Sequence, residues 1–69
     1  MASTGTPDAI YDLILVLQQA LEDCKRFGCF ANDARDESDA ELADFFQELG
    51  DSDEEIAERA KSLLVERLR

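Results

Sequence analysis

Two stretches of nearly equal length, roughly residues 7–36 and 39–68, carry apolar side chains at helical spacing and are joined by a few polar residues. Steps of three and four residues keep side chains on one face of an α-helix. In the first stretch the apolar positions are Ile10, Leu13, Leu17, Ala20, Cys24, Phe27, Ala31 and Ala34. In the second they are Leu42, Phe45, Phe46, Leu49, Ile56, Ala60, Leu63, Leu64 and Leu68. A short joint makes such helices antiparallel neighbours, so the sequence predicts an all-α helical hairpin.

Residue types at the ends of both stretches support these limits. Thr6-Pro7-Asp8 is typical of a helix start, with a hydroxyl cap, a proline and an acidic residue in the first turn. Ser38-Asp39-Ala40-Glu41 matches a capping box, in which Ser38 and Glu41 bond each other's backbone amides. We therefore expect a flexible leader over residues 1–5 and one domain over residues 6–69.

Gly50 leaves two interpretations of the second stretch open. Gly50-Asp51 followed by Ser52-Asp53-Glu54-Glu55 suits a helix end and a new capping box, which would give a three-helix monomer. However, Leu49 and Ile56 are seven residues apart, so the apolar face keeps its phase across the glycine. We favour one continuous helix, in which Gly50 is the position where a kink is possible.

The size of the chain makes self-association the simplest way to cover the apolar surface. A domain of 69 residues is close to the limit for an independent hydrophobic core. Two helices cannot cover apolar stripes this broad, so we expect a dimer, or a higher oligomer, forming an antiparallel four-helix bundle. The candidate interface residues are Ile10, Leu13, Ile14, Leu17, Leu21, Phe27, Phe45, Phe46, Leu49, Ile56, Leu63 and Leu64.

The formal net charge of −10 is concentrated in one region. Between Asp36 and Glu58 there are eleven carboxylates and no Lys or Arg. Such a segment repels phosphates, so we expect no nucleic-acid binding; a basic protein surface is an alternative partner. The longest apolar run, Leu13–Leu17, is far shorter than the ~18 residues that cross a bilayer. We expect a cytoplasmic protein that does not bind membranes.

Composition removes most catalytic chemistry. The chain has no histidine and its three glycines are scattered, which excludes histidine-based catalysis and glycine-rich phosphate loops. We expect no enzymatic activity, catalytic residue or cofactor. Asp53 is the one carboxylate expected to point inward, and it is a weak candidate for a metal ligand.

Cys24, Cys29 and Gly28 lie together in the first helix. The cysteines point about 140° apart around a helix axis, so they do not form a disulfide within it. Lys25 and Arg26 follow Cys24, and nearby cations lower a thiol pKa, so Cys24 is a candidate redox thiol. Cys29 is expected to be the more exposed of the two and is the candidate redox thiol for joining two chains under oxidising conditions. Packing of Cys24 in the core is the preferred interpretation. Gly28 is expected to let Phe45 or Phe46 of a neighbouring helix approach closely, with an opening for a small ligand as the alternative. The four phenylalanines are expected to cluster near the turn.

Two segments resemble ferritin-like (rubrerythrin-like) helical-hairpin proteins. They are Thr6–Ile14, and Asp39–Glu48 together with Ala57–Leu64. The resemblance implies half of a four-helix bundle. Ferritin-like proteins place inward Glu and His metal ligands in the part that corresponds to Gln18–Arg35, where this chain has Gln19, Lys25 and Gly28 instead. The resemblance therefore implies the scaffold without its metal ligands.

The sequence thus predicts a small acidic helical-bundle protein with a role in assembly or interaction and no catalysis of its own. The alternative hypothesis is a ferritin-like protein that binds metal or carries out redox chemistry through carboxylates.

Overall fold

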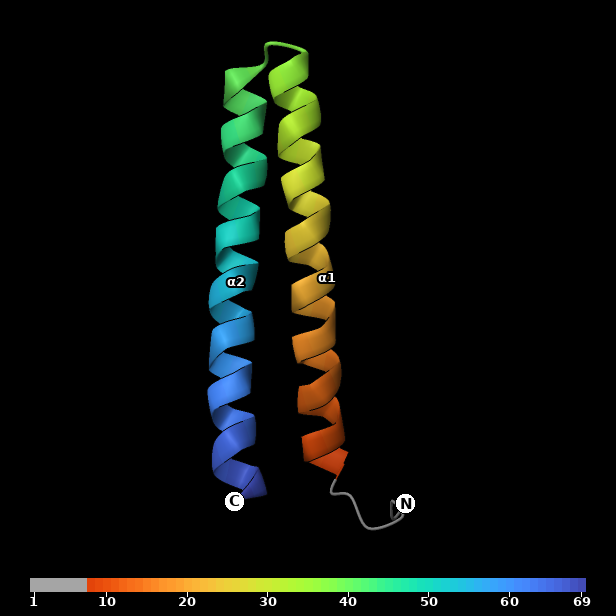
Figure 1. The fold of residues 1–69 in the computed structure, drawn as a ribbon, viewed down its shortest axis with the longest axis vertical. Coiled ribbons are helices and arrows are strands. Elements are labelled where there is room, and N and C mark those ends of the chain that lie inside the picture. The colour runs from red at the N-terminus through yellow and green to blue at the C-terminus, as the bar shows by residue number, and fades with distance from the viewer. Residues whose placement is uncertain (1–7) are drawn as a thin grey trace.

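A computed structural model describes residues 8–69 as two antiparallel helices of equal length (Figure 1). Helix α1 spans Asp8–Asp36 and helix α2 spans Ala40–Leu68, with 29 residues in each. They pack side by side along their length, and all regular structure in the described part of the chain is helical. The predicted all-α hairpin is confirmed, as are the ends of the two helices at Asp36 and Leu68, and α2 begins one residue after its predicted start. The leader and the Thr6-Pro7 part of the predicted helix start lie outside the described residues.

The turn between the helices is a compact C-terminal cap on α1. The amide of Asp39 donates to the carbonyl of Ala34 at 2.9 Å, and that of Ser38 donates to Arg35 at 2.9 Å. This bond pair, with Ser38 in the left-handed region at φ 61°, is a Schellman motif. Ser38 therefore belongs to the end of α1.

The N-cap of α2 is Asp39, one residue later than the predicted capping box. Its carboxylate accepts a hydrogen bond from the amide of Leu42 at 3.1 Å. Ser38 cannot cap α2 because it holds the left-handed position that closes α1. The predicted Ser38–Glu41 box is therefore wrong in register, although an acidic cap does start the helix.

Helix α2 runs through Gly50 without a break. Gly50 is half-buried and faces α1, since a Cβ placed on it would lie 3.7 Å from the Cβ of Phe27. The three-helix alternative is wrong, and the unbroken phase of the apolar face was the better guide.

Small side chains form the centre of the hairpin. The apolar residues that become buried are Ile10, Ala20, Ala31, Ala34, Ala43, Ala57 and Ala60. Leu13, Leu17, Cys24 and Phe27 of α1 are half-buried, so the predicted stripe of the first helix is confirmed. Short side chains on both helices let the backbones come close together, which leaves little room between them for larger groups.

The stripe predicted for the second helix is partly wrong. Leu42, Phe45, Ile56 and Leu68 are exposed, whereas Ala43 and Ala57, which that stripe omitted, are buried. Helix α2 therefore turns its alanines and Gly50 towards α1. Its bulky residues lie on either side of the line along which the two helices touch, which we call the contact line. Close backbone approach favours this rotation because bulky groups would hold the two helices apart.

Many large apolar side chains consequently remain on the surface. Among the described residues, no bulky side chain is less than 2% exposed. The large apolar residues with exposed fractions of 37% to 67% are Tyr11, Ile14, Leu15, Val16, Leu21, Phe30, Leu42, Phe45, Ile56, Val65 and Leu68. Isolated exposed apolar residues are normal, but so many on a short hairpin define its surface chemistry.

Candidate functional site

The two broad faces of the hairpin differ in chemistry, and the heptad positions beside the contact line define them. On each helix the positions facing the other helix recur every seven residues, as in Cys24 and Ala31 of α1. Each heptad has two such facing positions, and Cys24 and Ala31 are successive examples of the first. In an antiparallel pair, the residues that directly precede the first facing position of each heptad lie on one face, and the residues that directly follow the second facing position lie on the other face. We call these two surfaces the apolar face and the polar face.

The apolar face carries bulky apolar side chains along the whole α2 side and at two positions of α1. Its flanking residues are Val16 and Phe30 from α1 and Leu42, Leu49, Ile56 and Leu63 from α2. Leu49 and Leu63 are half-buried, and the other four are exposed. Phe45 is exposed and adjoins this row, with its ring 5.9 Å from that of Phe46.

An aromatic cluster closes the end of the apolar face that lies near the turn. The ring centroids of Phe27 and Phe30 are 5.9 Å apart, and those of Phe30 and Phe46 are 5.4 Å apart. Both pairs adopt edge-to-face geometry, which aromatic quadrupoles prefer. Together with Phe45, these rings confirm the predicted cluster of four phenylalanines.

Two carboxylates interrupt the apolar face near its centre. Asp23 and Asp53 line the same shallow hollow, with Val16 and Ile56 on its walls. Asp23 forms an ion pair with Arg26 at 3.1 Å and accepts a hydrogen bond from Gln19 at 3.0 Å. The sequence had placed only Asp53 inward, so the half-buried position of Asp23 is new.

Within the described part of one chain, few side chains that could bind a metal ion lie close together. Across residues 8–69, no three Asp, Glu, Cys or His side chains come close enough together to hold a metal ion. Asp53, the weak metal candidate, has Asp23 as its carboxylate neighbour in the hollow. Any site with more carboxylates would need residues from a second chain.

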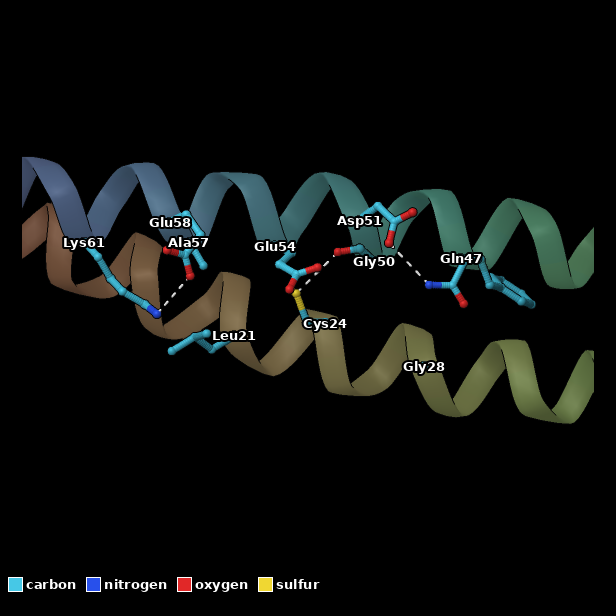
Figure 2. Close-up of a pocket in the computed structure, with 11 residues that line it drawn as sticks. Leu21, Cys24, Gly28, Gln47, Gly50, Asp51, Glu54, Ala57, Glu58 and Lys61 are labelled. Atoms are coloured by element: carbon cyan, nitrogen blue, oxygen red, sulfur yellow. Dashed lines mark hydrogen bonds and ion pairs between the residues drawn. The ribbon is translucent and has the colours of Figure 1, made fainter.

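The polar face contains a wider hollow of about 390 Å³ (Figure 2). Its floor consists of small groups, Cys24, Gly28, Gly50 and Ala57. Charged and polar side chains of α2 surround it, with Leu21 on the α1 side. These surrounding residues are Gln47, Asp51, Glu54, Glu58 and Lys61.

Hydrogen bonds already occupy several polar groups around this hollow. Gln47 donates to Asp51 at 3.3 Å, and the Lys61 ammonium lies 3.0 Å from the Glu58 carboxylate. The sequence pointed to this hollow only through the alternative of an opening at Gly28, because a glycine and alanine floor carries no chemical motif. It exists because small residues from two distant segments meet across the contact line.

The environment of Cys24 reverses the pKa shift expected from the sequence. Burial, followed by the charges of Asp53, Glu54, Asp23 and Asp51, raises the pKa of the Cys24 thiol above its ordinary value of 9.0. The Cys24 Sγ also donates to the carbonyl of Gly50 at 3.4 Å, a bond that only the neutral thiol can make.

The adjacent cations do not produce the expected effect because residues one and two positions along a helix do not face each other. Lys25 and Arg26 therefore point away from Cys24, and the carboxylates nearby dominate. The expected lowering of the Cys24 pKa is wrong. Cys29, the second candidate redox thiol, is a free and exposed cysteine.

Gly28 does not perform its expected role within the hairpin. A Cβ placed on Gly28 would meet nothing within 4 Å, so neither Phe45 nor Phe46 packs against it. Gly28 flanks the contact line on the polar face, whereas the aromatic cluster lies towards the apolar face. The predicted close approach at Gly28 is therefore wrong for the contact between α1 and α2.

The candidate interface residues fall into three groups in the hairpin. Ile10 is buried between the helices. The half-buried members are Leu13, Leu17, Phe27, Phe46, Leu49, Leu63 and Leu64. The exposed members are Ile14, Leu21, Phe45 and Ile56. Phe45 and Ile56 lie on or beside the apolar face, and Ile14 and Leu21 flank the polar face.

Comparison with known proteins adds no relative: no family model, curated protein or solved structure is significantly similar to this chain. In the described part of the chain, neither helix combines the length and apolarity needed to cross a membrane.

Proposed function

We propose that this protein is an assembly module, whose hairpins associate with one another into a four-helix bundle and which has no catalytic activity of its own. One observation carries the proposal. Of the seven apolar residues that are buried among the described residues, six are alanines, and the bulky apolar side chains of both helices other than Ile10 stay half-buried or exposed. A hairpin packed in this way buries little apolar area for the number of residues that it orders.

The energetic gain from association is substantial. Fully burying a Val, Leu, Ile or Phe side chain is worth about 1.5–3 kcal/mol. Side chains that are about half exposed, such as Val16, Phe45 and Ile56, would each gain on the order of 1 kcal/mol on being covered. Several such residues on one face can offset the loss of translational and rotational freedom that association entails.

Sedimentation velocity on the full chain, from about 1 to 100 µM, tests this proposal, with thermal unfolding measured over the same range. We expect a dimer or larger species, and a melting temperature that rises with protein concentration, because a partner that binds only the folded state stabilises it by mass action. A well-folded monomer at every concentration, with a melting temperature independent of concentration, would refute the proposal.

A carboxylate metal-binding or redox function, of the kind that the ferritin-like resemblance suggests, is the second candidate. The observation that favours it is the shared hollow of Asp23 and Asp53, since two chains joined over this hollow would contribute four carboxylates. Elemental analysis of protein purified without chelators tests it. Stoichiometric iron or manganese would support this function. Metal-free protein that still assembles would refute it and leave assembly as the only proposed role.

A further inference from the structure

We propose that the apolar face binds the same face of a second copy of this chain, so that the polar face remains turned outward. This inference rests on the proposed function, because it specifies which surface performs the assembly. The resulting contact is isologous, with the same residues contributed by both subunits about a two-fold axis.

Continuity of the apolar surface distinguishes the two faces. On the apolar face, α2 places a bulky aliphatic residue at every flanking position from Leu42 to Leu63. On the polar face the corresponding positions of α2 include Gln47, Glu54 and Lys61. Large apolar residues flank the polar face at Ile14, Leu21 and Leu68, from the open end of the hairpin to the middle of α1. Only the apolar face therefore carries an unbroken row of bulky apolar side chains along α2, to which α1 adds Val16 and Phe30.

The edges of the apolar face have the character of an interface rim. Exposed polar residues of both signs follow the outer side of each helix. They are Asp12, Gln19, Arg26 and Asp33 on α1, and Ser52, Arg59 and Glu66 on α2. An apolar centre surrounded by a polar, solvated rim is the usual organisation of protein interfaces.

Arg26 balances one of the two carboxylate charges at the centre of this face. It already pairs with Asp23, so this carboxylate enters the contact with its counter-ion. Asp53 lines the same hollow, and a single polar position in an apolar contact is a device that fixes the register of paired helices.

The dimensions of the face match a second hairpin. A helix of 29 residues is about 43 Å long, and two helices side by side are roughly 20 Å wide, which gives a footprint on the order of 850 Å². A standard stable interface buries about 800 Å² on each partner. A single helical peptide would cover only about half of this footprint, so the face fits another two-helix layer.

A matched pair of substitutions tests the choice of face. Ile56 on the apolar face is 47% exposed and Leu21 beside the polar face is 45% exposed, so a lone hairpin should tolerate a lysine equally at either position. Ile56→Lys should weaken association by at least about 100-fold, because an unpaired charge would enter the contact. Leu21→Lys should associate as strongly as the wild-type chain.

A second pair repeats the comparison on neighbouring residues of α1. Val16, on the apolar face, is 47% exposed, and Leu15, on the side of α1 away from α2, is 44% exposed. Val16→Lys should dissociate the assembly and Leu15→Lys should not. Sedimentation velocity and far-ultraviolet circular dichroism are measured for all four variants.

The outcomes separate this inference from the proposed function. A loss of assembly or of helix that is confined to Ile56→Lys and Val16→Lys supports the inference, because the lone hairpin exposes all four positions alike. Equal effects across each pair, or dissociation by Leu21→Lys or Leu15→Lys instead, would overturn it while self-assembly stands. A wild-type chain that is monomeric throughout would refute the proposed function itself.

Discussion

Replacing Gly28 with alanine should stabilise the protein, and the structure sets the size of the effect. Glycine inside a helix is about 0.8–1.0 kcal/mol less favourable than alanine, because its backbone loses more freedom on folding. At Gly28 the new methyl group would meet nothing within 4 Å, so no steric term reduces this gain. We expect about 1 kcal/mol of added stability, or a melting temperature about 4–8 °C higher for a chain of this size.

The measurement is thermal and urea unfolding, followed by circular dichroism at one fixed protein concentration, because assembly makes stability depend on concentration. Gly50→Ala is the matched control. Its methyl group would lie 3.7 Å from the Cβ of Phe27, an ordinary van der Waals contact, so its gain should be at least as large.

The opposite result would be informative about the surface. If Gly28→Ala lowers the melting temperature or loosens the assembly, another chain must approach the helix closely at that position. The polar face would then be covered in the assembly, contrary to the orientation proposed above.

Three further predictions concern the turn and the thiols. Asp39→Ala should destabilise the protein by about 1 kcal/mol in urea unfolding, because it removes the side-chain acceptor of the Leu42 amide. Ser38→Ala should have a much smaller effect. Equal losses of stability in the two variants would instead support Ser38 as the cap of α2. At pH 8, Cys24 in a Cys29→Ser variant should react with iodoacetamide more slowly than Cys29 in a Cys24→Ala variant, because the raised pKa leaves less thiolate; equal or faster reaction of Cys24 contradicts this. The folded state favours the protonated Cys24 thiol, so its contribution to stability is complete below pH 9.0 and is lost as the pH rises through the raised pKa, a dependence that Cys24→Ala should remove.

Sequence reasoning came close to the helices because their signals are local. Apolar spacing, the polar joint and the capping-box pattern predicted the end of α1 and both ends of α2 to within one residue. The phase of Leu49 and Ile56 correctly indicated a continuous helix through Gly50. These features depend on neighbours within one or two helical turns, which a single sequence displays directly.

The side of α2 that meets α1 was harder to predict. Hydrophobicity ranks Leu42 and Ile56 above Ala43 and Ala57, so a stripe chosen by apolar character assigns the bulky residues to the interior. The helices instead come together through their smallest side chains, because alanine and glycine permit the closest backbone approach. The apolar face, on which both proposals depend, results from that rotation.

The amino-acid order was therefore sufficient for the helical state, the hairpin topology and the clustering of the phenylalanines near the turn. The rotation of α2 and the pKa of Cys24 depended on three-dimensional packing. Gly50 and Asp53 lie more than twenty-five residues beyond Cys24 in the chain, yet they determine its hydrogen bond and much of its electrostatic field. Local periodicity shows which face of a helix is apolar, but only the approach of two backbones selects the side chains that fit between them.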